Sequence, residues 1–168
     1  MRILALALAL ACAPGFAVHA AAPSPALTDS PFAAACADAV VESLGGRTWL
    51  LTDGFADSRL VAQAKARGID LLAMPLRGGD AAVVAAFEAA AAALGDPRLE
   101  AAAALGPAPF VLTWMQQRPE EAAAKLALMV EPSLAKAAGL EPVPAGLVYH
   151  LYKPDALGSN ALARAYAH

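Results

Sequence analysis

Four charged side chains follow the first two predicted strands of this chain, and their types and spacing are the best candidates for binding chemistry. Asp53 and Asp57 lie in the loop after the first strand, and Arg77 and Asp80 lie in the loop after the second. Ligands of open α/β sheets bind beyond the carboxyl ends of the strands, so these loops would border one crevice near the amino ends of two helices. An arginine and free helix N–H groups would there hold a small polar ligand, such as a sugar or a carboxylate.

The same residues also fit local structural roles. Asp57 and Asp80 are of a type that caps helices, and Asp53 followed by Gly54 is typical of a turn. The glycines beside them give the backbone freedom. The two interpretations differ in one respect: either the four charged side chains converge on an open cleft, or each serves its own helix or turn.

Other chemistries have less support. The turn after the first strand has one glycine, Gly54, where a dinucleotide fingerprint needs three, and carboxylates there would repel a pyrophosphate. Two aspartates without further ligands at the right spacing do not define a magnesium site. His150 has no nucleophile to serve, because the chain has no Gly-x-Ser-x-Gly elbow. The sequence therefore predicts no catalytic residue, no metal site and no cofactor.

A strand–helix–strand–helix pattern between residues 47 and 95 positions the two loops. Residues 47–52 and 69–75 are apolar throughout, as strands covered on both faces are. Ser30 followed by Pro31 predicts an N-cap and a first helical residue. Such starts, together with the glycines that follow, predict helices over 32–44, 57–67 and 80–94. Short connections between such elements are typical of parallel strands joined by right-handed crossovers.

The second half of the chain has a helical pattern. Helices that start near prolines are expected over 97–105, 109–117, 119–130 and 132–138. A third strand is expected over 146–152, after an extended segment at 141–144, and a short helix over 159–167. The predicted fold class is therefore α/β: a small Rossmann-like unit with a short, mostly parallel three-stranded sheet and a helical C-terminal half.

The N-terminal residues have the order of a secretory signal. Arg2 precedes an apolar run at 3–13, then a Pro14-Gly15 breaker, then Val18 and Ala20 at small-residue positions. Cleavage after Ala20 divides the chain into a signal peptide (1–20), a linker (21–29), an α/β domain (30–152) and a C-terminal tail (153–168).

An uncleaved anchor is the alternative interpretation of this leader. Residues 3–22 are numerous enough to span hydrocarbon, although Pro14, Gly15 and His19 interrupt them. In both interpretations the domain is exported, either free in the periplasm or outside the cell, or tethered to a membrane.

The charge of the chain argues against nucleic acid as a partner, and its cysteine content argues against an internal disulfide. The chain has 12 basic and 15 acidic residues and a formal net charge of −3, so it has no electrostatic reason to bind nucleic acid. Cys12 lies in the leader, so the exported form would hold a single thiol, Cys36, and no internal disulfide.

Three stretches resemble a known kind of protein. Residues 47–55 (RTWLLTDGF), 109–114 (PFVLTW) and 137–144 (AAGLEPVP) are similar to the soluble extracytoplasmic segment of uncharacterised bacterial multi-spanning membrane proteins, some of which carry helical repeats further on. The resemblance covers residues 32–152 and implies no catalytic residues. This chain departs from it in having at most one membrane segment and no repeats, so the resemblance implies a shortened or split relative.

These observations favour an exported, non-enzymatic α/β module that binds a protein partner or sits beside a membrane assembly. The alternative is a small periplasmic domain that binds a small polar ligand through Asp53, Asp57, Arg77 and Asp80. An enzyme that uses His150 is a third possibility, for which the sequence offers no nucleophile.

Overall fold

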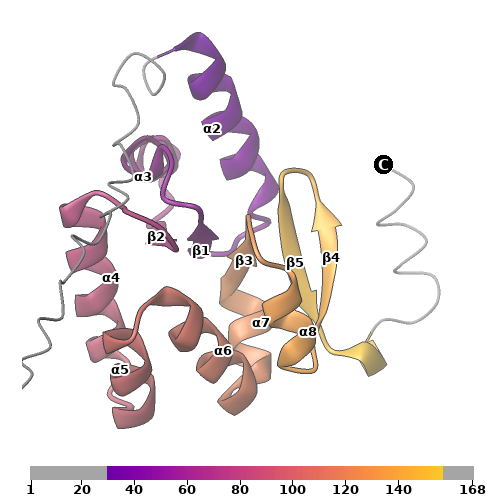
Figure 1. Cartoon of the computed structure of the whole chain (residues 1–168). Helices are drawn as coiled ribbons and strands as arrows, with labels where there is room; N and C mark the ends of the chain where they lie inside the picture. The colour runs from indigo at the N-terminus through magenta and orange to yellow at the C-terminus, as the bar shows by residue number, and fades with distance from the viewer. Residues whose placement is uncertain (1–29, 157–168) are drawn as a thin grey trace, which may run out of the picture.

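The computed structural model describes residues 30–156, which form a five-stranded mixed sheet with helices on both faces (Figure 1). The helices are α2 (Pro31–Ser43), α3 (Asp57–Ala66), α4 (Ala81–Ala93), α5 (Pro97–Ala104), α6 (Pro107–Gln117), α7 (Pro119–Lys125), α8 (Ser133–Ala137) and the 3-10 turn η1 (Pro154–Ala156). The strands are β1 (Trp49–Thr52), β2 (Leu72–Pro75), β3 (Leu126–Leu128), β4 (Glu141–Ala145) and β5 (Val148–Tyr152). The predicted α/β class is confirmed; the helix predicted at 159–167 lies outside the described residues.

β1 lies inside the sheet, whose strand order is β2-β1-β3-β5-β4. It pairs in parallel with β2 on one edge and with β3 on the other, so that Leu50 is opposite both Ala73 and Ala127. β5 pairs antiparallel with β3 and with β4. The chain therefore moves to one side of β1 to form β2 and returns to the other side to form β3.

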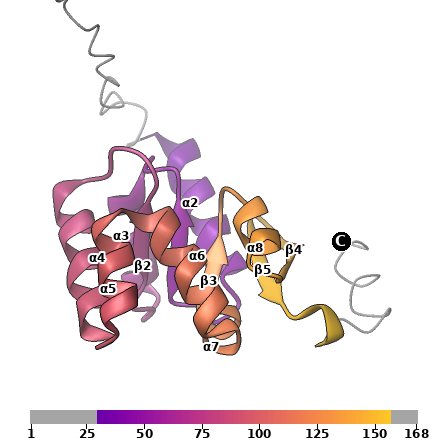
Figure 2. The same cartoon turned by 60° about the horizontal axis from the view of Figure 1, so that its bottom comes forward.

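The two faces of the sheet bury two separate hydrophobic clusters, because successive side chains of a strand point to opposite faces. Leu51 faces the cluster under α4, α5 and α6, and Leu50 faces the cluster under α2 and α3. Both leucines are fully buried. Figure 2 shows α4, α5 and α6 nearer the viewer than α2 and α3, which cover the opposite face.

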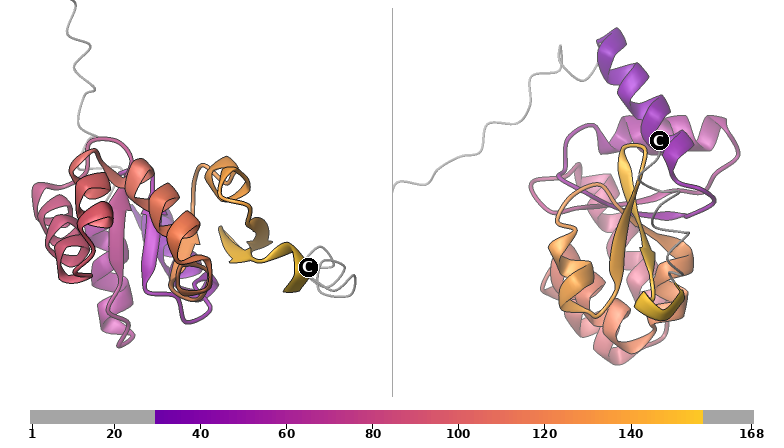
Figure 3. Two further views of the ribbon diagram at one scale, coloured as in Figure 1. Left: turned by 90° about the horizontal axis from the view of Figure 1, so that it is seen from below. Right: turned by 90° about the vertical axis from the view of Figure 1, so that its right-hand side faces the viewer.

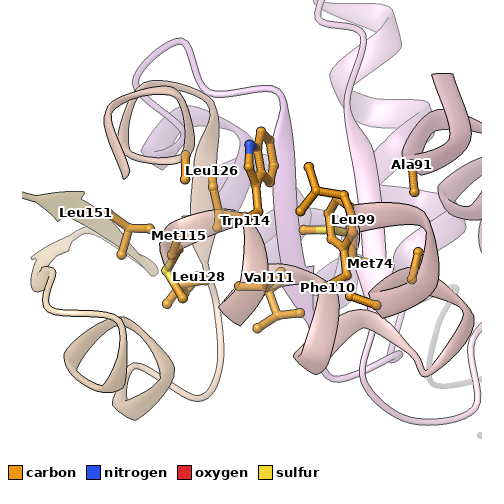
Figure 4. Close-up of a cluster of buried hydrophobic side chains, with 14 of the residues drawn as sticks. Met74, Ala91, Leu99, Phe110, Val111, Trp114, Met115, Leu126, Leu128 and Leu151 are labelled. Atoms are coloured by element: carbon orange, nitrogen blue, oxygen red, sulfur yellow. The ribbon is translucent and has the colours of Figure 1, made fainter. Parts of the chain in front are cut away.

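Aromatic rings fill the larger cluster (Figure 4). The ring of Trp49 lies 4.9 Å from that of Trp114 and 5.7 Å from that of Phe110, and Phe87 meets Phe110 edge-on at 5.2 Å. Centroid separations of this size are typical of favourable aromatic pairs, which add about 0.5–1.5 kcal/mol each beyond the area that they bury. Trp49 thereby fixes the start of β1 against α6.

The sheet has five strands where the sequence predicted three, and β3 is one of the two missed strands. The sequence predicted a single helix over 119–130, whereas α7 ends at Lys125 and the chain continues as β3. No glycine or proline separates the two elements, and alanine, leucine and lysine all favour a helix. Pairing with β1 and the burial of all three β3 residues override this local preference.

The other missed strand is β4, and it changes the role of the predicted third strand. The strand expected at 146–152 exists as β5, but it is antiparallel and does not pair with β1. Instead it forms a hairpin with β4, which the sequence predicted only as an extended segment. Pro142 and Pro144 lack the N–H donors of a central strand, and β4 tolerates them because it lies at the sheet edge. "Mostly parallel" is therefore wrong, since only two of the four strand pairs are parallel.

Replacement of Leu51 by alanine tests the central position of β1. Deletion of a fully buried leucine side chain removes its contacts and leaves a cavity, so we expect Leu51→Ala to lower the free energy of unfolding by about 2–5 kcal/mol. Chemical denaturation followed by circular dichroism measures this change. Leu105→Ala is the control, because Leu105 is 79% exposed, and we expect a change within about 0.5 kcal/mol. A loss below about 1 kcal/mol for Leu51→Ala would contradict the buried position of this strand.

Candidate functional site

The loop after β1 and the loop after β2 meet at the carboxyl edge of the sheet. Gly54 has a φ of +96°, and a Cβ on it would lie 1.8 Å from the backbone oxygen of Arg77. Only glycine therefore fits at this position. Ser58 also joins the two loops, because its Oγ donates a hydrogen bond of 2.9 Å to Oδ2 of Asp80. The structure thus brings the two predicted loops together, as the strand pattern implied.

Asp80 and Asp53, two of the four predicted ligand residues, are engaged in local structure. Asp80 is the N-cap of α4, and its Oδ1 accepts a hydrogen bond of 2.8 Å from the Ala82 N–H. This bond, with that from Ser58, lowers the pKa of the Asp80 carboxyl. Oδ1 of Asp53 accepts a hydrogen bond of 2.9 Å from the Phe55 N–H, which closes the turn after β1.

Arg77, the third predicted ligand residue, is exposed and has no ion-pair partner among residues 30–156. Its backbone rather than its side chain makes the contact with Gly54. A guanidinium that stands alone in solvent contributes little to stability, and it is free to meet an anion.

Asp57, the fourth, is almost fully buried, with 2% of its surface exposed. It is the first residue of α3, but the N-cap position belongs to Ala56, which is in the left-handed conformation. Neither carboxylate oxygen has a hydrogen bond of good geometry within residues 30–156. Burial raises the pKa of Asp57 to about 6; the nearby Thr52 hydroxyl offsets part of this rise, and the charge of Asp53 adds to it. Desolvation therefore outweighs the positive end of the α3 dipole, which favours a carboxylate by about 0.3–1 kcal/mol.

An apolar groove of about 340 Å³, which was not predicted from the sequence, opens beside this loop. One wall is the N-terminal half of α2 and the other is formed by the loop after β1, the start of α3 and the residue after β3. The lining residues are Ser30, Phe32, Ala33, Cys36, Ala37, Val40, Phe55, Ala56, Leu60 and Met129. The spacing of Phe32 and Cys36 by one helical turn, and a phenylalanine in a loop of aspartates at Phe55, were the signals in the sequence.

A helix cap and two ion pairs hold α2 and α3, which contribute to the walls of the groove. Ser30 Oγ accepts a hydrogen bond of 3.1 Å from the Ala33 N–H and Pro31 begins α2, which confirms the predicted helix start. Arg67 at the end of α3 forms ion pairs with Asp38 and Glu42 of α2, at 2.6 and 3.3 Å. Beyond them the first turns of α2 project past the rest of the domain (Figure 3).

A second hollow of about 350 Å³ lies between α3, β2 and α4. Ser58 and Asp80 form its polar part, and the remaining lining residues are Val61, Leu71, Leu72, Ala73, Ala82, Val83 and Ala86. Of the four predicted ligand residues only Asp80 lines this hollow, and none lines the apolar groove. The structure therefore places the four in neighbouring loops without gathering their side chains around one of these two hollows.

His150 is held by the end of α2. Its Nε2 lies 2.8 Å from the Ser43 carbonyl oxygen, and a Cβ on Gly45 would lie 2.7 Å from its ring. Burial lowers the pKa of His150, and the positive charge of Arg47 lowers it further. Its ring therefore joins the β4–β5 hairpin to α2, a positioning role for which no nucleophile is needed.

Residues 30–156 contain neither a metal-binding cluster nor a membrane-spanning helix. No cluster of three or more histidine, cysteine, aspartate or glutamate side chains is arranged to hold a metal ion. No helix in this part of the chain has both the length and the apolar character needed to cross a membrane.

No protein-family model, curated protein or solved structure matches this chain at a significant level. The resemblance to extracytoplasmic segments of multi-spanning membrane proteins therefore stays a prediction.

The buried Asp57 carboxyl makes stability depend on pH. Its pKa is about 6 in the folded protein and near 3.8 when unperturbed, so the folded state favours the protonated form and loses stability as pH rises from about 4 to about 6. We expect Asp57→Asn to raise the free energy of unfolding at pH 7.5 by up to about 3 kcal/mol and to leave it nearly unchanged at pH 3.5. Urea denaturation at both pH values measures the difference.

Asp53→Asn is the matched control, since Asp53 is exposed in the same loop and asparagine keeps the Oδ1 acceptor. This variant should retain most of the pH dependence. Equal effects of Asp57→Asn at the two pH values would show that the carboxyl is not desolvated.

Proposed function

We propose that this chain is an exported, non-enzymatic α/β binding module, and that its apolar groove holds an apolar side chain of a polypeptide partner. The observation that carries the proposal is the groove between α2 and the loop after β1, with its uncharged lining and its exposed aromatic rim.

The groove occupies the place where α/β sheets bind their ligands. From β1 the chain leads to β2 at one edge of the sheet, and from β3 it leads to β4 at the other edge. Because the connections after β1 and β3 run in opposite directions, the carboxyl ends of these two neighbouring strands border a crevice. Phe55 and Ala56 follow β1, and Met129 follows β3; all three line the groove. We propose that β1–α3–β2 is a Rossmann-like unit and that it supplies one wall of the binding site.

The lining favours an apolar group. Ser30 is the only polar side chain besides the thiol of Cys36 among the described residues that line the groove, and none is charged. Phe32 and Phe55 stand at its rim with 78% and 40% of their surface exposed. Interface centres are depleted of charge and enriched in aromatic residues, which supply much of the binding energy when a partner covers them.

The size of the groove suits one or two side chains. Its volume of about 340 Å³ is near the lower end of the range for small-molecule sites, which is roughly 300–1,000 Å³. Phenylalanine, leucine and methionine side chains of a partner are small enough for one or two of them to enter it together. A partner protein or membrane assembly that presents such a residue is therefore the occupant that we propose.

Binding without catalysis fits the groove better than enzymatic chemistry does. Cys36 and Ser30 are the nucleophilic side chains among the described lining residues, and Ser30 Oγ serves as the N-cap of α2. Neither a histidine nor a carboxylate is among these lining residues to activate the thiol or the hydroxyl. A small polar ligand held by Arg77 is less well supported, because Asp53 and Asp80 already serve the turn and the α4 cap. Export rests on the N-terminal leader alone.

A fluorescent apolar probe tests whether the groove accepts such a group. Anilinonaphthalene sulfonate would place its rings in the groove and leave its sulfonate in solvent. We expect saturable binding at low protein concentration, with a dissociation constant on the order of 10–100 µM. Fluorescence titration measures it.

Two tryptophan variants of α2 make the test specific. Cys36→Trp fills the groove and should weaken probe binding at least tenfold, whereas Ala35→Trp adds the same ring on the exposed side of the helix and should change it little. Equal binding by the two variants, or no saturable binding by the unmodified protein, would refute the proposal.

A further inference from the structure

We infer that the occupant of the groove is Phe32 of a second copy of this chain, so that two copies pair about a twofold axis through the N-terminal halves of their α2 helices. This inference rests on the proposed function, because it names the partner of the same groove.

Phe32 is the apolar group best placed to enter a groove on another molecule. It lies in the first turn of α2, which projects beyond the rest of the domain, and 78% of its surface is exposed (Figures 1 and 3). The exposed large apolar residues among residues 30–156 are Phe32, Phe55, Leu105 and Leu147, and of these only Leu105 is as exposed as Phe32. Two of them, Phe32 and Phe55, belong to the groove.

The position of Phe32 beside the groove makes a symmetric exchange possible. In a twofold pair the same surface contacts itself, so a residue that enters the partner's site is matched by the partner's residue entering its own. Because Phe32 and the groove lie on one patch, each copy both gives a ring and receives one. The contact then closes after two copies and leaves neither groove open.

No side-chain charge in the first two turns of α2 opposes such a pair. The first seven residues of α2, residues 31–37, carry no charge, and four of them are alanines that allow close approach. The first acidic residues of the helix, Asp38 and Glu42, are paired with Arg67 of the same molecule. Contact between residues 31–37 of two copies therefore brings no like-charged side chains of these residues together.

The area available is that of a weak dimer. A fully buried phenylalanine hides about 150–250 Å², so covering Phe32 and Phe55 on both copies supplies on the order of half of the roughly 1,000 Å² that a specific interface needs. The alanine-rich turns of α2 supply further area. We therefore expect reversible association rather than a permanent dimer.

Sedimentation equilibrium of the full chain with Cys12→Ala, over a series of concentrations, measures the association. We expect a monomer–dimer equilibrium, with Phe32→Ala raising the dissociation constant by about 30-fold or more. Leu105→Ala is the matched control, since Leu105 is 79% exposed but lies away from the groove, and it should leave the constant unchanged. A Phe32→Ala protein that dimerises as well as the unmodified chain would overturn the inference.

Complementation between two defective variants tests the exchange of rings directly. Phe32→Ala lacks the ring and one rim residue of its own groove but leaves that groove unfilled, and Cys36→Trp keeps the ring but fills its groove. Each variant alone should remain monomeric, whereas a mixture should form a heterodimer through one ring-in-groove contact. A mixture that associates no more strongly than either variant alone, at concentrations high enough to populate a dimer with a single contact, would place the dimer interface elsewhere and refute the inference.

The failures of the two proposals are distinguishable. A protein that binds the fluorescent probe in the groove and stays monomeric at every concentration overturns the second copy as occupant and leaves the binding function standing. A protein that is monomeric at low concentration and whose groove does not bind the probe there overturns both.

Discussion

β1 is buried on both faces only because β2 and β3 satisfy its backbone hydrogen bonds along both edges. Leu50 and Leu51 point to opposite sides and are fully buried, so the strand needs a layer of helices on each side as well as a partner on each edge. The pairing with β3 extends past the strand, where the Met129 N–H donates to the Leu51 carbonyl at 2.9 Å. The two hydrophobic clusters and the crossing of the chain from β2 to β3 both follow from this burial.

The same burial of β1 shapes the groove and places an acidic side chain in a buried position beside it. With β2 and β3 on either side, the residues after β1 are pressed against the Arg77 backbone, which only Gly54 permits, and Phe55 is turned toward α2. Asp57 then begins α3 beneath this loop, where burial raises the pKa of its carboxyl. The loop that shapes the apolar groove thus carries a buried acid that opposes folding at neutral pH, a pattern common at functional sites.

Residues with a strong local signal were predictable from the sequence, and residues positioned by distant contacts were not. β1, β2 and the caps at Ser30 and Asp80 followed from apolar runs and capping chemistry. β3 could not be predicted, because its three residues favour a helix and become a strand only by pairing with β1. The groove was missed for a similar reason: its walls come from α2, the loop after β1 and Met129, which no sequence pattern connects.

A methyl NMR titration with anilinonaphthalene sulfonate tests the central claim, that the apolar crevice at the end of β1 and β3 is the binding surface. The methyl groups of Ala33, Ala37 and Met129 line this groove, and those of Val83 and Ala86 line the hollow between α3 and α4. The structure predicts saturable shifts at the first three, with one dissociation constant, and none at the other two. Shifts confined to Val83 and Ala86, or spread evenly over both sets, would contradict it.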